Sequence, residues 1–207
     1  ASDERGRPLI ILVDDYNLPV GRVQMVRDQL SRFIRSGTNA DDLIGLYYAG
    51  ESASDGRLTI DRDSLAQKLS ALASWQVNAA PPRTGEHLMR VSANGADPTL
   101  RQQDRARLLL YTLRSVSQAV GSRALRRARM VLVSPGFPHR WHRRGETILP
   151  ELEQTVDVAN RSNVTIHAVD PSGMRGFDLG LAHGVSARPQ STLTSPNTDA
   201  LSILSLD

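Results

Sequence analysis

Cysteine is absent from the 207-residue chain, and lysine occurs once, as Lys68. Without cysteine the chain can form no disulfide, no thiol nucleophile and no zinc–thiolate site. The scarcity of lysine also excludes Schiff-base chemistry and a phosphate-binding P-loop lysine. The sequence further lacks a Ser-His-Asp elbow and a Gly-x-Gly-x-x-Gly motif after a strand. We therefore expect a binding domain and not an enzyme.

Long apolar runs are missing too, since no window approaches the roughly 18 apolar residues that a membrane span needs. The pattern of a secretory leader does not open the sequence, so we expect a leader to be absent or already removed. Apolar residues make up 40% of the chain and charged residues 23%, which is typical of globular proteins. This length suits one α/β domain, which we expect to cover residues 1–207.

The strongest structural signal is the run Leu9-Ile10-Ile11-Leu12-Val13, which stops abruptly at Asp14 and Asp15. Consecutive branched apolar residues are typical of a parallel strand that helices cover on both faces. In an open parallel sheet the carboxyl ends of the strands face the crevice where ligands bind. The two carboxylates therefore fall where a binding site is expected.

Helical and strand-like segments alternate along the rest of the chain. Helical spacing predicts helices over 19–37, 61–75, 97–120 and 149–159, and apolar runs predict strands over 42–49, 57–60, 130–134 and 164–170. The order predicts an α/β fold with a Rossmann-like, doubly wound, mostly parallel sheet flanked by helices. We expect the short 57–60 run to be an antiparallel edge strand. Residues 76–98 have the composition of a loop, and residues 200–204 hint at a closing helix.

Two enzyme-associated interpretations of the Asp-Asp strand end fail on their own requirements. Receiver domains of two-component systems carry a lysine on their last strand, whereas the last strand here runs from Val164 to Asp170 without one. Phosphatases of the haloacid dehalogenase type need Asp-x-Asp, and the second position after Asp14 is Tyr16.

Several stretches resemble the von Willebrand factor A-related domains of predicted secreted bacterial proteins. They are 9–18, the second and third predicted strands, 130–137 and 159–171. The most specific is the last, in which an Ala-Asn-Arg helix end leads into a strand and Asp-Pro-x-Gly. The resemblance implies a protein-interaction module of adhesion or scaffold type, outside the cytoplasm. Domains of that family continue after the segment like 198–204 with one more strand and a helix, so we expect the domain to lack these two elements.

Metal-binding members of that family have a metal-ion-dependent adhesion site, in which an Asp-x-Ser-x-Ser loop, a distant Thr and a further Asp hold a divalent ion. Asp14 matches the first Asp, and Thr84 or Thr99 could supply the threonine. The other positions fall on Tyr16 and Leu18 in place of the serines and on Pro135 in place of the further Asp. We therefore expect a degenerate site with no cofactor, in which Asp14 is a weak candidate ligand that holds Mg²⁺ weakly at most.

Two roles stay open for Asp14 and Asp15: they cap the helix that begins near Pro19, or they face a ligand. We expect a partner protein to contact the strand ends. The expected contact residues are Asp14, Asp15, Tyr16, Asn17, Thr99, Ser134 and Phe137.

An arginine-rich stretch between residues 123 and 144, with Trp141 inside it, is the second functional candidate. Clustered arginines around an aromatic residue are typical of a surface that binds phosphates. The candidate anion-binding residues are Arg126, Arg127, Arg140, Arg143 and Arg144. Solvated arginines that flank a buried strand explain the same pattern, and no nucleic-acid-binding motif accompanies it. A phosphate- or nucleic-acid-binding protein is therefore the alternative, and nucleic acid is the less favoured partner.

Overall fold

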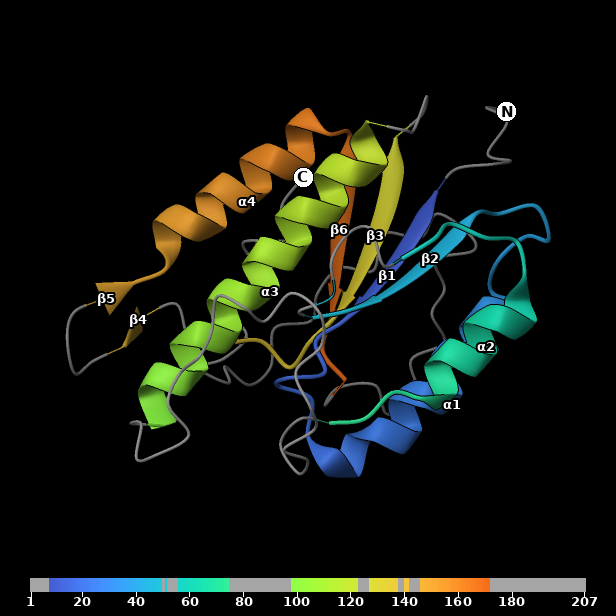
Figure 1. Ribbon diagram of the computed structural model, residues 1–207, viewed down its shortest axis with the longest axis horizontal. Coiled ribbons are helices and arrows are strands. Elements are labelled where there is room, and N and C mark those ends of the chain that lie inside the picture. Colours follow the sequence, from blue (N-terminus) through green and yellow to red (C-terminus); the bar gives the residue numbers. More distant parts are fainter. Residues whose placement is uncertain are drawn as a thin grey trace, which may run out of the picture.

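The fold is that of a computed structural model that describes residues 8–49, 51, 56–74, 98–122, 127–137, 140–141 and 146–171. In these ranges the main sheet has four strands: β1 (Leu9–Val13), β2 (Ile44–Tyr48), β3 (Ala128–Val133) and β6 (Val164–Val169). Their order is β2-β1-β3-β6, and every neighbouring pair is parallel. The predicted α/β sheet is confirmed (Figure 1).

Helices cover both faces of this sheet. The 3₁₀ turn η1 (Val20–Arg22) leads into α1 (Val23–Ser36), and α2 (Arg62–Ser70), α3 (Pro98–Gly121) and α4 (Leu149–Arg161) follow. Side chains alternate along a strand, so Ile11 of β1 packs with α1 and α2 while Ile10 packs with α3 and α4. Both faces of β1 are thus buried, which explains its uninterrupted apolar run.

The chain order places a topological switch point between β1 and β3. From β1 the chain passes through α1 to β2 on one side, and it later returns to β3 on the other side. In Figure 1 the carboxyl ends of the strands point downward, toward the loop that leads into α1. Ligands of open α/β sheets bind at this position.

The predicted helix starts agree with local chemistry at α2. Its N-cap is Asp61, whose carboxylate accepts hydrogen bonds from the backbone N–H groups of Asp63 (3.0 Å) and Ser64 (3.1 Å). This satisfies two donors that the first helical turn leaves open.

The antiparallel edge strand predicted at 57–60 is wrong. In the described part of this run a single antiparallel bridge forms, between Ile44 and Thr59. The two residues exchange backbone hydrogen bonds of 2.9 Å in both directions. No further ladder is built on the outer edge of β2 by residues 56–60.

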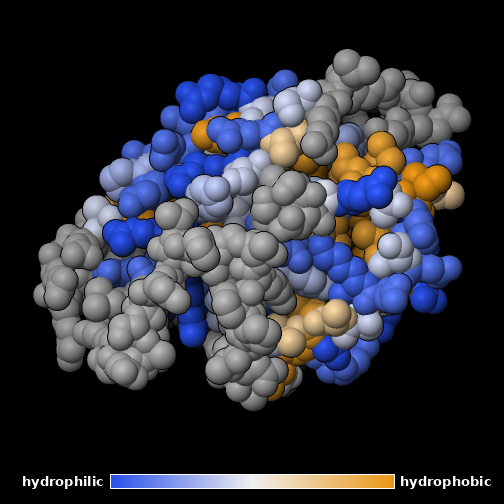
Figure 2. All heavy atoms as spheres, viewed as in Figure 1, coloured by the Kyte–Doolittle hydropathy of each residue, from blue (hydrophilic) through white to orange (hydrophobic). Residues whose placement is uncertain are grey.

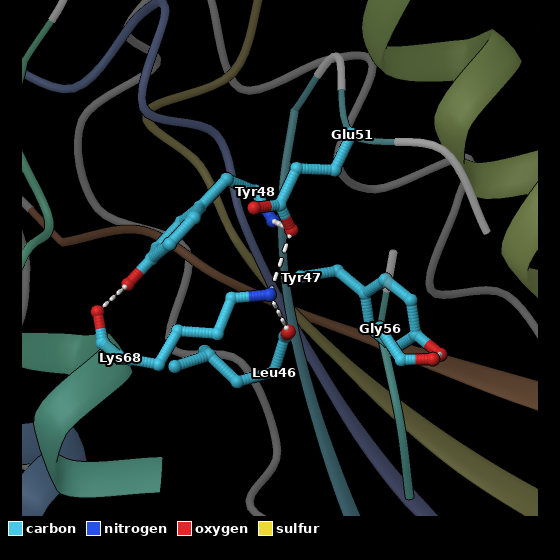
Figure 3. A network of polar contacts seen from close by, with 6 residues as sticks. All are labelled: Leu46, Tyr47, Tyr48, Glu51, Gly56 and Lys68. Carbon is cyan, nitrogen blue, oxygen red and sulfur yellow. Dashed lines mark hydrogen bonds and ion pairs between the residues drawn. The ribbon is translucent and has the colours of Figure 1, made fainter. Parts of the chain in front are cut away.

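Side chains take the backbone groups of β2 that a longer edge strand would need (Figure 3). The Lys68 ammonium donates to the Leu46 carbonyl (2.7 Å), and Glu51 Oε2 accepts from the Tyr48 N–H (3.0 Å). The same Glu51 oxygen lies 2.9 Å from Lys68 Nζ, so the two caps support each other. The Tyr48 hydroxyl donates to the Lys68 carbonyl (2.7 Å). This Lys68–Glu51 clip explains why pairing stops after one bridge.

The outer surface differs between the two sides of the molecule. Figure 2 shows mainly hydrophilic residues over α4 and an apolar area on the side of β2. Leu43 and Ile60, which flank the bridge at the amino end of β2, are 36% and 60% exposed. An open strand edge next to apolar residues favours association with another chain. The Lys68–Glu51 clip occupies backbone groups of this edge and so opposes such pairing.

A separate two-stranded ribbon joins β4 (Arg140–Trp141) and β5 (Glu146–Thr147) in antiparallel fashion. It was not predicted, because two-residue strands leave no periodic pattern in a sequence. The predicted loop at 76–98 lies outside the described residues except for Pro98, which begins α3. The predicted closing helix at 200–204 lies outside them as well. No helix in the described ranges is long and apolar enough to cross a membrane.

Candidate functional site

Asp14 is the centre of a hydrogen-bonded cluster at the switch point. Its side chain is fully buried directly after β1. Oδ2 accepts from the Ser134 hydroxyl, 2.7 Å away across the boundary between β1 and β3. Asn17 donates its backbone N–H to Oδ1 (3.2 Å), and its side-chain amide lies 3.2 Å from Oδ1 and 3.0 Å from Oδ2. Both carboxylate oxygens are therefore occupied by donors from the protein.

The chain around Asp14 forms a tight turn that is anchored in both cores. The Leu18 N–H donates to the Asp14 carbonyl (3.0 Å), which closes the turn. Leu18 packs into the core beneath α1 and α2, whereas Tyr16 packs into the core beneath α3 and α4. The N-caps of η1 and α1 are Pro19 and Arg22, and neither makes a side-chain capping bond. Asp14 instead accepts the backbone N–H of Asn17, ahead of η1, and a capping role of Asp15 stays a prediction.

The loop after β3 is built around Ser134. Its backbone N–H donates to the Val169 carbonyl (3.1 Å), and its hydroxyl accepts from the Gly136 N–H (3.0 Å). Gly136 has φ 80°, which only glycine adopts without strain. Phe137 follows and is fully buried in the core beneath α3 and α4. The Ser134 hydroxyl thus joins its own loop to the turn after β1.

Burial raises the pKa of Asp14, because desolvation penalises the charged form. Hydrogen bonds from Ser134 and Asn17 and the positive charge of Arg105 oppose this shift without cancelling it. The cluster therefore holds a carboxyl group that gains a proton more readily than one in water.

Arg105 of α3 is the site residue that the sequence did not indicate. Its Nη1 donates to the Tyr16 carbonyl (3.3 Å), and its charge acts on Asp14. The side chain is partly exposed at the rim of the strand ends. Helical periodicity predicted which α3 residues face the core, but the position of α3 along the strands depends on the preceding connection. No pattern in the sequence gives that position.

The structure brings most of the predicted contact residues together but buries them. Asp14, Asp15, Tyr16, Ser134 and Phe137 are each less than a tenth exposed. Asn17 is partly exposed, and Thr99 lies in the first turn of α3, where the side chain is outside the described part. The buried members support the two loops. Other exposed groups near the strand ends are Val20 (47% exposed) and the partly exposed Pro135.

The residues at the strand ends do not fit a divalent metal. Tyr16 and Leu18, which replace the serines of the adhesion-site motif, are core residues. Both oxygens of Asp14 already accept hydrogen bonds. Among the described residues, no group of three or more His, Cys, Asp or Glu side chains could hold a metal ion. That no divalent ion binds tightly stays a prediction.

The structure describes the backbone of two of the candidate anion-binding arginines, one before and one after β3. Arg127 is exposed just before β3, whereas Arg140 lies in β4, after the other end of β3. A strand of six residues spans about 20 Å. Arg126, Arg143 and Arg144 lie outside the described residues. The side chain of Arg140 lies outside the described part as well, so the anion-binding face stays a prediction.

Comparison with known proteins gives structural similarity alone. No family model matches the sequence, and no curated protein is significantly similar to it. Among solved structures, the chain is similar to the pilus adhesin SpaC from Lactobacillus rhamnosus GG in an open conformation, with a TM-score of 0.46 and 13% identity. The alignment covers 81% of this chain and 24% of that chain, so this chain spans about a quarter of the adhesin's length. At this identity and TM-score the similarity carries no inference about function.

Proposed function

We propose that this chain is a protein-recognition module of the von Willebrand A type, not an enzyme, which binds a partner protein outside the cytoplasm. The observation that carries the proposal is the Asp14–Asn17–Ser134 cluster, which ties the loops after β1 and β3 together at the switch point. Loops that are already ordered lose little conformational freedom on binding, so they favour recognition.

The contact surface in this proposal is the exposed rim around the cluster. It combines an apolar residue, Val20, with the partly exposed Asn17, Pro135 and Arg105. The buried carboxylate of Asp14 positions Asn17 and the β3 loop and does not itself touch the partner. Mixed apolar and polar surfaces of this kind are typical of non-obligate interfaces.

A photo-crosslinking residue placed at Val20 tests the recognition surface, with Ile60 as the matched control. Both are exposed aliphatic residues, but Val20 follows the carboxyl end of β1 while Ile60 lies beside the amino end of β2. We expect a discrete crosslinked protein from Val20 and none from Ile60, identified by mass spectrometry. The crosslink should weaken in Asn17→Ala. Equal crosslinking at both positions, or no crosslink at Val20, would contradict the proposal.

Recognition in this proposal needs no bridging metal. Calorimetric titration of Mg²⁺, Mn²⁺ and Ca²⁺ into chelator-treated protein should show no binding tighter than the millimolar range, since the Asp14 oxygens are already bonded. The Val20 crosslink should form equally well with EDTA present. Micromolar binding that disappears in Asp14→Ala would show that the degenerate loop is still a metal site.

A further inference from the structure

Arg105 differs from Arg107, Arg114 and Arg62 in its partner, which is the backbone of the turn after β1. On the same helix, Arg107 Nε lies 3.6 Å from Glu151 Oε1, and Arg114 donates to Gln154 Oε1 (3.1 Å). Arg62 at the start of α2 donates to three backbone carbonyls. In the part of the chain that the structure describes, Arg105 makes one hydrogen bond, to the Tyr16 carbonyl. The described residues therefore engage only one of its five N–H donors.

The hydrogen bond to the Tyr16 carbonyl fixes the place of this guanidinium. It holds Arg105 against the turn after β1, over the switch point where the proposed contact surface lies. The carboxylates beneath are not on the surface, because Asp14 and Asp15 are fully buried. Asp14 is also satisfied by Ser134 and Asn17. The rim therefore presents the positively charged guanidinium of Arg105 above buried carboxyl groups.

We propose that Arg105 binds a carboxylate of the partner, so that the module recognises an acidic segment of a protein. This inference rests on the proposed function and names the chemistry of its partner. A guanidinium matches a carboxylate with two parallel N–H donors, which gives geometric selectivity as well as attraction. Val20 and Pro135 supply apolar contact beside the charge, so the preferred segment carries an Asp or Glu next to apolar residues.

Selection of a random peptide display library on the intact protein tests this. Peptides that bind the wild type and lose binding to Val20→Gln are kept as binders of the rim. We expect them to be enriched in Asp or Glu, and we expect Arg105→Gln to weaken them about five- to tenfold, as for a partly buried charge pair. The matched control is Arg107→Gln, two residues further along α3 and paired with Glu151, which should bind them like the wild type.

A double-mutant cycle separates recognition by Arg105 from a structural role. Replacing the peptide acid by its amide should cost as much as Arg105→Gln, and the two changes together should cost no more than either alone. Arg105→Lys, which keeps the charge, should restore part of the binding, and the melting temperatures of all variants show whether the fold is intact. Rim peptides without acidic enrichment, or equal losses in Arg105→Gln and Arg107→Gln, would overturn this inference and leave the recognition surface standing. A library that yields no peptide sensitive to Val20→Gln would contradict the proposed function itself, and this inference with it.

Discussion

At the scale of single residues, Asp14 shows how one buried carboxyl joins two loops that are far apart in the sequence. Its burial raises its pKa above the value of 3.8 that applies to an exposed carboxyl. Between pH 3.8 and the raised pKa of Asp14 in the folded protein, the folded state binds more protons than the unfolded state. The free energy of unfolding therefore falls as the pH rises through this window, starting from about pH 4.

Asp14→Asn removes this titration, so the free energy of unfolding should depend on pH differently in the variant and in the wild type. As the pH rises from about 4, the wild type should lose stability relative to Asp14→Asn until the pKa of folded Asp14 is passed, and the difference should then stay constant. Urea denaturation at a series of pH values measures it. Asp28→Asn on the exposed face of α1 is the control for the lost negative charge. A difference between wild type and Asp14→Asn that does not change with pH would contradict the role of burial.

Two fully buried serines make a second test at this scale. Ser134 donates to Asp14, whereas the Ser117 hydroxyl oxygen of α3 is buried without a hydrogen-bond partner in the described structure. Ser134→Ala should lower the free energy of unfolding by about 1–3 kcal/mol, because it leaves Asp14 short of a donor. Ser117→Ala should be neutral or stabilising, since it removes an unsatisfied polar atom. Equal effects in chemical denaturation would show that the Asp14–Ser134 bond contributes little.

At the scale of elements, the packing of α3 against the end of α4 depends on a glycine. A Cβ atom added to Gly121, the last residue of α3, would lie 2.6 Å from the Ser162 carbonyl oxygen. Gly121→Ala should therefore destabilise the fold by about 1–3 kcal/mol, because backbone must move apart. The control is Gly21→Ala in η1, where nothing lies within 4 Å, and it should be neutral or stabilising by up to about 1 kcal/mol. Thermal unfolding that ranks the two variants in the opposite order would contradict this packing.

The Lys68–Glu51 clip predicts an effect on both stability and association. Lys68→Met keeps the aliphatic stem but leaves the Leu46 carbonyl and the Glu51 carboxylate without the ammonium. We expect a loss of about 1–2 kcal/mol in unfolding free energy and concentration-dependent association through the uncovered edge of β2. Arg35→Met, on the exposed face of α1, controls for the lost positive charge. Light scattering that finds Lys68→Met as monomeric as Arg35→Met would show that the clip does not guard the edge.

At the scale of the whole molecule, the sequence predicted the sheet well and the site in part. The run from Leu9 to Val13 has one physical explanation, burial on both faces, so both β1 and the place of Asp14 could be predicted. The 57–60 strand could not be corrected from the sequence, because its pairing is limited by Lys68, which is eight residues or more away. The role of Arg105 could not be predicted for the same reason, because it depends on how α3 lies against the turn at Tyr16. Local patterns predict elements, whereas contacts between distant elements decide which side chains meet.

The distribution of arginine bears on the phosphate-binding alternative. The chain has 25 basic and 22 acidic residues, so any strong affinity for polyanions must come from clustering and not from net charge. Arg127 directly precedes β3 and Arg140 lies in β4, and the strand β3 between them spans about 20 Å. We therefore expect Arg127 and Arg140 not to act as parts of one phosphate-binding face.

This expectation predicts that DNA binding is weak and that its affinity changes little with salt concentration. A continuous face of five arginines would give a slope of log Kobs against log salt of about −4 to −5, whereas three arginines that act alone would give about −3. Anisotropy of a labelled duplex between low and physiological salt measures the slope. Arg127→Gln and Arg140→Gln should have small and additive effects, because we expect the two positions to act independently. A slope of −4 or steeper that both substitutions reduce together would restore the nucleic-acid candidate, since only one continuous surface could produce it.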